Sequence, residues 1–324
     1  MSRKVYMLPR FVQYVKPYFD EHNVEIVEGP QDNLDDLMCY ALECDAIMVA
    51  LGPICREYME AAKNLKIAAK LGVGVDNMDC KTAEELGIWC GFAPQSNSLS
   101  VAEYTITAIC NLSRKYSRLI EATLKNNWQG RLPELIGCEM EGKTLGLIGL
   151  GRIGAIVAKK AYCGLGMRVI GFDKYVNPAD LPDGIELVED VDCLIEQADY
   201  ISLHTPLTDE TRNLIDARRL ALMKPTAFLI NIARGPIVDE EALYEALRDG
   251  RLAGAALDAL IIEPPVVTNP LFTLPNVYIS PHKASHTVDA QRRMAEHAAM
   301  NIVAVLDGKE PVWAVNRPNT PRSL

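Results

Sequence analysis

The stretch from Thr144 to Gly154 most constrains what this chain can fold into. A short apolar run, Thr144–Ile148, leads into the pattern Gly149-x-Gly151-x-x-Gly154, and helical apolar spacing follows at once. In such a turn the first glycine permits the tight bend, the second lets backbone approach a pyrophosphate, and the third lets the helix pack on the strand. Free N–H groups at the helix N-terminus favour phosphate charge. The stretch therefore predicts a dinucleotide-binding strand–turn–helix unit.

A second predicted strand, Arg168–Phe172, strengthens this interpretation because it ends in Asp173. That carboxylate lies nineteen residues after Gly154, close to the ~20 expected for the group that binds the ribose hydroxyls. A glycine turn beside an unrelated surface aspartate is the alternative, and the surrounding strands and helix disfavour it. Because an aspartate here would repel a 2′-phosphate, NAD is favoured over NADP.

Composition narrows the class of protein further. The 324 residues suit about two domains. The net charge of −10, with no basic stripe, argues against a nucleic-acid partner. No apolar run approaches the ~20 residues of a membrane span, and no signal peptide is seen. The nine cysteines contain no C-x-x-C pair, so we expect free thiols, a cytoplasmic location and no metal site.

The pattern along the chain predicts an α/β fold with two Rossmann-like domains, each built on a parallel sheet. Strand and helix patterns alternate through the first hundred residues and again after residue 143. Between them, Ser100–Asn126 reads as one long helix that forms a spine between the domains. The last helix, Val288–Leu306, is expected to cross back to the first sheet. We therefore expect residues 1–99 with 288–324 as a substrate-binding domain and 100–287 as the NAD-binding domain.

Polar side chains follow several of the predicted strands, where ligands bind in open parallel sheets. They are Asp173, His204, Arg234, Asp258, Glu263 and His282. Any one of them could be a helix cap or a turn former. Arg234 follows a buried strand, so its guanidinium needs an anionic partner, either a ligand carboxylate or a protein carboxylate. His282 is a candidate general acid and base, and Glu263 could hold its imidazole.

Taken together, these motifs resemble the D-isomer-specific 2-hydroxyacid dehydrogenases. The resemblance covers nearly the whole chain in the family's order, and its phosphoglycerate dehydrogenase and hydroxypyruvate or glyoxylate reductase branch is the most similar. The matching segments are Val73–Asp79, Asn97–Glu103, Gly149–Gly154, Asn231–Gly235, Gly254–Asp258 with Glu263–Pro265, and Ser280–His282.

The resemblance implies an active site in the cleft between the two domains and a role for each matching residue. Arg234 would bind the substrate carboxylate and carbonyl, His282 would donate the proton, and Glu263 would be its partner. Other substrate contacts would come from Leu51, Val73, Gly74, Val75 and Asn97. The NAD contacts would come from Gly149, Gly151, Arg152, Ile153, Gly154, Asp173, His204, Thr205, Ile232, Ala233, Asp258 and Ala284. The family also implies a homodimer.

Three departures from the family's pattern bear on the substrate. Where phosphoglycerate dehydrogenases carry an arginine after the third strand, this chain has Ala50, which speaks against a phosphorylated substrate, although Arg131 could supply a cation. Lys283 stands where the family has a small or apolar residue, and it could meet a second acidic group or solvent. The chain stops at Leu324, so no C-terminal regulatory domain is expected.

The sequence favours an NAD-dependent enzyme that interconverts a small 2-keto acid, of hydroxypyruvate or glyoxylate type, and its D-2-hydroxy acid. A 3-phosphoglycerate dehydrogenase is one alternative. An NAD(H)-sensing scaffold is another, because the C-terminal-binding-protein corepressors share the arginine, glutamate and histidine. A formate dehydrogenase is disfavoured, since those enzymes place glutamine where Glu263 stands.

Overall fold

A computed structural model describes residues 3–50, 52–125, 128 and 133–322. The sequence-based expectations for Leu51, Asn126 and Arg131 lie outside these described residues. The chain divides into two compact units, Met1–Asn97 with His286–Leu324 and Ser98–Ser285. The chain passes from one unit to the other after Asn97 and again after Ser285. Each of these boundaries lies two residues before the one expected from the sequence.

The first unit is built on a five-stranded sheet of order β2-β1-β3-β4-β5, and every strand pairs in parallel. Its strands are β1 Arg3–Met7, β2 Val24–Glu28, β3 Ala46–Val49, β4 Ile67–Lys70 and β5 Trp89–Gly91. Strands β3 and β4 are almost wholly buried, because helices cover both faces of a parallel sheet. The loops that follow β3 and β4 therefore leave the sheet at the same edge.

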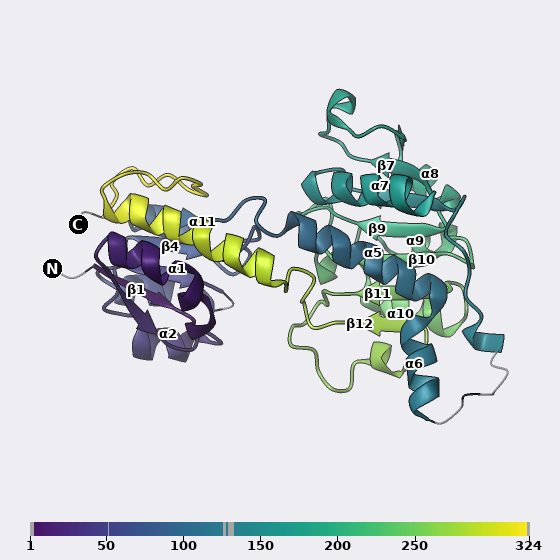
Figure 1. Cartoon of the computed structure of the whole chain (residues 1–324), viewed down its shortest axis with the longest axis horizontal. Helices are drawn as coiled ribbons and strands as arrows, with labels where there is room; N and C mark the ends of the chain where they lie inside the picture. The colour runs from purple at the N-terminus through teal and green to yellow at the C-terminus, as the bar shows by residue number, and fades with distance from the viewer. Residues whose placement is uncertain (1–2, 51, 126–127, 129–132, 323–324) are drawn as a thin grey trace. The chain divides into compact units, whose positions relative to one another are not determined.

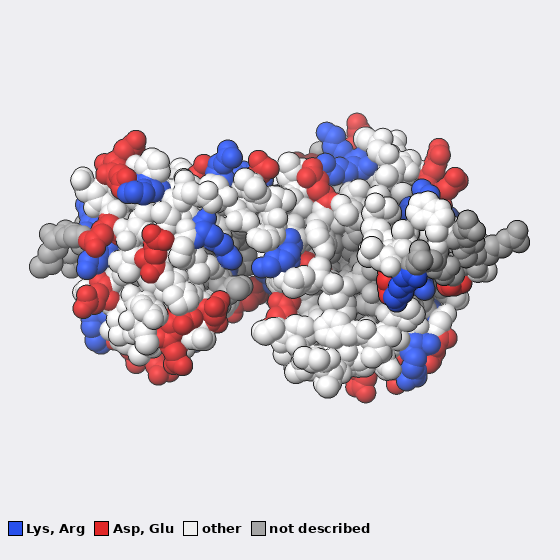
Figure 2. Space-filling model, turned by 60° about the horizontal axis from the view of Figure 1, so that its bottom comes forward, with Lys and Arg blue, Asp and Glu red and all other residues white. Residues whose placement is uncertain are grey.

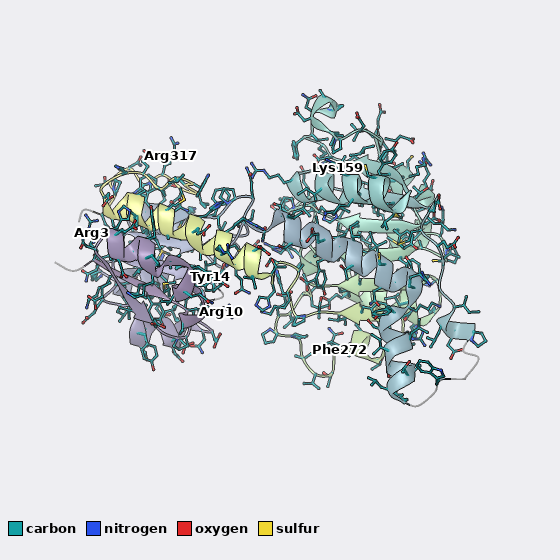
Figure 3. The ribbon with its side chains drawn as sticks, in the orientation of Figure 1. Arg3, Arg10, Tyr14, Lys159, Phe272 and Arg317 are labelled. Atoms are coloured by element: carbon teal, nitrogen blue, oxygen red, sulfur yellow. The ribbon has the colours of Figure 1, made fainter. Side chains whose placement is uncertain are left out.

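The helices that the structure describes in this unit are α1 Pro9–Glu21, α2 Leu34–Tyr40, α3 Arg56–Ala61, α4 Cys80–Glu85 and α11 Val288–Leu306. Helix α11, at the yellow end of Figure 1, packs beside α1 and over β3 and β4. Its buried side is rich in alanine, at Ala295, Ala298 and Ala299, which allows close packing. Arg3, labelled in Figure 3, joins β1 to the end of α11 through a 2.6 Å ion pair with Asp307.

The second unit holds a seven-stranded parallel sheet of order β12-β11-β10-β9-β6-β7-β8. The strands are β6 Thr144–Ile148, β7 Arg168–Phe172, β8 Ile185–Leu187, β9 Tyr200–Leu203, β10 Phe228–Asn231, β11 Gly254–Leu257 and β12 Val277–Ile279. The order of strands reverses between β6 and β9, the switch point at which such sheets bind ligands. The glycine turn follows β6 directly, so the chain places it at this point.

The described residues of the second unit form the α-helices α5 Ser98–Arg114, α6 Tyr116–Leu124, α7 Arg152–Leu165, α8 Val191–Gln197, α9 Ala217–Leu222 and α10 Glu240–Arg248. Short 3₁₀ turns occur at η1 Pro133–Leu135, η2 Pro178–Asp180, η3 Gly235–Ile237 and η4 Pro270–Thr273. Helices α5 and α7 pack against each other, as Figure 1 shows. Strand β8 and helices α8 and α9 were not predicted from the sequence.

The single long helix expected at Ser100–Asn126 is wrong, because the structure has two helices there. Lys115 separates α5 from α6 and has a left-handed backbone, with φ 51°. The side-chain Oδ1 of Asn111 accepts hydrogen bonds from the backbone N–H of Ser117 at 2.9 Å and from its hydroxyl at 3.0 Å. These two bonds hold the start of the second helix in its new direction.

Two surface properties accompany this fold. Among the described residues, no helix is both long enough and apolar enough to cross a membrane. On the face drawn in Figure 2, lysine and arginine side chains lie among aspartate and glutamate side chains and form no continuous basic stripe.

Candidate active site

The glycine turn between β6 and α7 has the geometry that a bound pyrophosphate needs. Gly149 has φ +97°, and a Cβ there would lie 2.7 Å from the carbonyl carbon of His204. A Cβ on Gly154 would lie 2.1 Å from the carbonyl oxygen of Gly149, so this position admits only glycine. By contrast, a Cβ on Gly151 would meet no atom within 4 Å. Two glycines therefore pack the turn tightly, and the third leaves open space beside the start of α7.

Polar groups around this open space also fit a dinucleotide. Asp173, directly after β7, accepts backbone N–H groups from Leu150 and Tyr175, both at 2.8 Å, which fixes its carboxylate beside the turn. The hydroxyl of Thr205, after β9, is buried without a hydrogen-bond partner in the described structure. Since buried hydroxyls are nearly always paired, this orphaned group is consistent with a ligand that supplies the missing bond. Arg152 and Ile153 open α7 at the same turn.

His204 packs against the glycine turn as an uncharged side chain. Its Nε2 lies 2.9 Å from the hydroxyl of Ser202. Burial lowers the pKa of His204 to about 4, because a desolvated imidazole resists taking up a proton. The imidazole is therefore uncharged at neutral pH.

The structure brings Glu263 and His282 together. The Nδ1 atom of His282 lies 2.7 Å from Oε2 of Glu263, and the other carboxylate oxygen accepts the backbone N–H of Leu260 at 2.9 Å. Burial acts to raise the pKa of Glu263, but the hydrogen bonds from His282 and Leu260 outweigh it, so the pKa is lowered. Glu263 is thus an anion that orients the ring.

A second carboxylate, Asp258, holds the loop that carries His282. It is 2% exposed. One of its oxygens accepts the hydroxyl of Ser280 at 2.6 Å and the N–H of Lys283 at 2.8 Å, and the other accepts the N–H of Ala284 at 2.8 Å. These bonds bracket His282, whose φ of 53° lies in the left-handed region that costs a non-glycine residue about 1–2 kcal/mol. Asp258 therefore stabilises an unfavourable backbone at the candidate catalytic residue.

Arg234 follows β10 and is fixed by its neighbours. The side chain of Asn231 accepts the N–H of Ala233 at 3.1 Å and donates to the carbonyl of Arg234 at 2.9 Å. The guanidinium donates to the carbonyl of Ala233 at 2.8 Å. Its charge also contributes to the lowered pKa of Glu263, so a fixed cation accompanies the acid–base pair. Ile232 and Ala233 lie on the same short segment.

The residue after Arg234 must be glycine for a steric reason. A Cβ on Gly235 would lie 2.0 Å from the carbonyl carbon of Leu260. Leu260 is the residue whose N–H binds Glu263. The close approach of these two backbones therefore sets the position of the loop that carries Glu263 relative to Arg234.

The remaining candidates belong to the first unit. Val73, Gly74 and Val75 lie in the loop after β4, and Val73 is 44% exposed. Asn97 ends the unit's first segment, and its Oδ1 is buried without a hydrogen-bond partner in the part of the chain that the structure describes. Leu51 lies outside the described residues, while its neighbour Ala50 is buried after β3.

Sequence reasoning missed several residues that build this site. It assigned Asp258 to the cofactor and overlooked its bonds to the His282 loop. It did not single out Gln31, Lys70 or Asn77, whose side chains donate to backbone carbonyls of β3 and the loop after it. Lys70 also donates to the side chain of Asn77. A lysine at a strand end and an asparagine in the following loop are weak signals alone, because both are common at surfaces.

Comparisons with known proteins agree with this geometry. Residues 106–284 match the family described as D-isomer specific 2-hydroxyacid dehydrogenase, NAD binding domain. The chain is 40% identical over 291 residues to the D-3-phosphoglycerate dehydrogenase of Methanocaldococcus jannaschii, covering 89% of this chain and 55% of that protein. It is 40% identical over 288 residues to the glyoxylate reductase of Thermofilum pendens, covering 87% and 84%. The chain thus spans about half the length of the phosphoglycerate dehydrogenase.

A solved structure, that of the TT0316 protein from Thermus thermophilus, superposes with a TM-score of 0.86 at 36% identity. The alignment covers 97% of this chain and all of that one. A glycine turn at the switch point of a parallel sheet is the arrangement of a dinucleotide-binding unit. The chain belongs to the D-isomer-specific 2-hydroxyacid dehydrogenase family. The matched segment is that family's NAD-binding domain, so the cofactor is NAD.

The close approach at Gly235 leads to a prediction about stability. Replacing Gly235 by alanine forces Cβ into the backbone of Leu260, so the free energy of unfolding should fall by about 1–3 kcal/mol. Gly164→Ala is the matched control, because a Cβ there meets nothing within 4 Å. Chemical denaturation would compare the two, and equal stability of both variants would contradict the steric argument.

The lowered pKa of His204 predicts how stability depends on pH. The unfolded chain takes up a proton near pH 6.5 and the folded chain only near pH 4, so stability is full above pH 6.5 and declines as pH falls toward 4. Between pH 7 and pH 5 this group should account for a loss of roughly 1–2 kcal/mol. A His204→Gln variant should lose less over that interval in denaturant titrations. An unchanged pH slope would refute the assignment.

Proposed function

We propose that this protein interconverts a small 2-keto acid and its D-2-hydroxy acid, with glyoxylate or hydroxypyruvate as the keto acid. The observation that carries the proposal is the 2.7 Å contact between Glu263 and His282. It lies in the same unit as Arg234 and the glycine turn, and that unit contains the matched NAD-binding segment. Two relatives named for these chemistries support the choice of reaction.

The proposed roles follow from charge. NADH, when bound at the glycine turn, supplies a hydride to the carbonyl carbon of the keto acid. Negative charge then develops on the carbonyl oxygen, and the fixed guanidinium of Arg234 stabilises it. His282 donates a proton from Nε2 to that oxygen while Glu263 stabilises the charged ring through Nδ1. In the reverse direction His282 begins neutral and accepts the proton.

We assign the other residues to binding. For NAD these are Gly149, Gly151, Arg152, Ile153, Gly154, Asp173, His204, Thr205, Ile232, Ala233, Asp258 and Ala284. Backbone N–H groups of Val73, Gly74 and Val75 would receive the substrate carboxylate, with Leu51 and Asn97 beside it. The buried orphan atoms of Thr205 and Asn97 support their places in the two sets.

A small, unphosphorylated substrate fits this chain better than a phosphorylated one. The position after β3 is the buried Ala50, which offers no cation to a phosphate. A phosphorylated hydroxypyruvate is the second candidate, because the archaeal phosphoglycerate dehydrogenase is as similar in sequence as the glyoxylate reductase is.

We also propose that the protein is a cytoplasmic homodimer. Helix α6 buries none of its own residues, yet Tyr116, Leu119, Ile120 and Leu124 are exposed on it, Leu124 at 82%. An apolar helix face of this kind is typical of a surface covered by another chain. All nine cysteines are free thiols, which suits a reducing compartment.

The reaction is tested with initial rates of NADH oxidation on a panel of glyoxylate, hydroxypyruvate, pyruvate, phosphohydroxypyruvate and 2-oxoglutarate. Glyoxylate or hydroxypyruvate should have the highest kcat/KM. Arg234→Lys keeps the charge but loses the planar fork, so kcat/KM should fall at least about 100-fold. Preference for phosphohydroxypyruvate would support the second candidate. No turnover of any acid, with NADH still bound, would leave a sensing scaffold as the better interpretation.

The dimer is tested by light scattering after size-exclusion chromatography. Leu124→Glu places a charge on the exposed face of α6 and should convert the dimer to a monomer. Val267→Glu, at a position 95% exposed on the same unit, is the control and should remain dimeric. A wild-type protein that runs as a monomer would refute the proposal.

A further inference from the structure

The first unit contains a polar network that joins the loop after β3 to the loop after β4. The ammonium of Lys70, at the end of β4, donates to the carbonyl of Ala50 and to Oδ1 of Asn77, both at 2.6 Å. The other side-chain atom of Asn77, Nδ2, donates to the carbonyl of Gly52 at 2.8 Å. We call Lys70 and Asn77, with these two carbonyls, the Lys70–Asn77 pin.

Backbone contacts continue the pin along both loops. The N–H of Ile54 donates to the carbonyl of Asn77 at 2.9 Å, and the N–H of Asp79 donates to the carbonyl of Ile54 at 2.8 Å. Ile54 and Met78 thereby form an isolated parallel bridge. The two loops are thus joined at several points.

A buried amide holds the same segment from the opposite side. Gln31, 1% exposed, donates to the carbonyl of Met48 and accepts the N–H of Ala50, both at 3.0 Å. Ala50 therefore has its N–H fixed by Gln31 and its carbonyl fixed by Lys70. The backbone on both sides of residue 51 is restrained by side chains from other parts of the unit.

The pin has an electrostatic consequence for any anion that binds to these loops. The carbonyl oxygens of Ala50 and Gly52 carry partial negative charge, and each accepts a hydrogen bond from the pin instead of facing a ligand. Lys70 also places a formal positive charge three residues before Val73. A partly buried cation attracts a carboxylate more strongly than a cation in bulk water does.

We propose that Lys70 is a positioning residue for the substrate. It fixes the loops after β3 and β4 relative to each other, and it adds positive potential to the carboxylate site at Val73–Val75. This inference rests on the proposed function, since that function makes these loops the substrate-binding ones. Lys70 touches neither the cofactor nor the reacting atoms in this role. Its removal should therefore weaken binding of the keto acid and leave NADH binding, which belongs to the other unit, unchanged.

A lysine at the opposite end of β4 provides a matched control. Lys66, directly before β4, is 7% exposed and pairs with Asp45 at 2.5 Å. Lys66→Met removes a buried cation from the same unit and should lower its melting temperature. It leaves the loops after β3 and β4 intact, so it separates loss of stability from loss of substrate binding.

The experiment compares wild type, Lys70→Met, Lys70→Arg and Lys66→Met in the full-length protein. It measures KM and kcat for the best keto acid of the panel, Kd for NADH by fluorescence, and Kd for oxamate in the presence of NADH. Oxamate carries a carboxylate beside a carbonyl and is not reduced, so it reports binding without turnover.

Lys70→Met should raise KM and the oxamate Kd at least about tenfold, as expected for the loss of a charged hydrogen-bonding group. NADH affinity should not change, Lys70→Arg should recover most of the loss, and Lys66→Met should keep the wild-type KM. The proposal is overturned by an unchanged KM in Lys70→Met, by parallel loss of NADH binding, or by the same rise in Lys66→Met. If no keto acid reacts but oxamate binding still depends on Lys70, the proposed reaction fails and the role of Lys70 stands.

Discussion

The carboxylate of Asp258 is the interaction on which the candidate active site depends. One nearly inaccessible side chain accepts a hydroxyl and two backbone N–H groups, and those donors lie on either side of a histidine in a left-handed conformation. Without such an anchor the backbone would relax toward ordinary dihedral angles and carry the imidazole away from Glu263. Strained geometry at a functional residue persists only where the surroundings determine it, and here a single buried anion does so.

The same arrangement, a carboxylate that accepts backbone N–H groups at a strand end, occurs again after β7. Asp173 binds the N–H groups of Leu150 and Tyr175 and so connects the glycine turn to the end of β7. In the first unit, side-chain amides and an ammonium restrain carbonyl groups of β3 and of the loop that follows it. Strand ends are where backbone groups lose their partners in the sheet, so polar side chains there serve to hold loops as well as to bind ligands.

Much of the fold could be predicted from the sequence, because buried parallel strands give continuous apolar runs and the glycine turn has a strict spacing. Elements without these signals were missed. Strand β8 lies at the edge of its sheet with two exposed residues out of three, so it has no apolar run to detect. The break at Lys115 depends on a hydrogen bond that the side chain of Asn111 accepts from the N–H of Ser117, six residues later. Arg234, Glu263 and His282 could be named from strand ends and motifs, whereas Lys70, Gln31 and Asn77 act through contacts that are not local in sequence.

The division of the chain also governs the order in which its parts can fold. The second unit is one continuous segment, whereas the first is assembled from two segments that flank it. Helix α11 supplies Met294, Ile302 and Leu306 to the core on one face of the first sheet. During synthesis, that face is covered only in part, by α1, until the whole second unit has left the ribosome. The cofactor-binding half can therefore form its core before the half that begins the chain is complete.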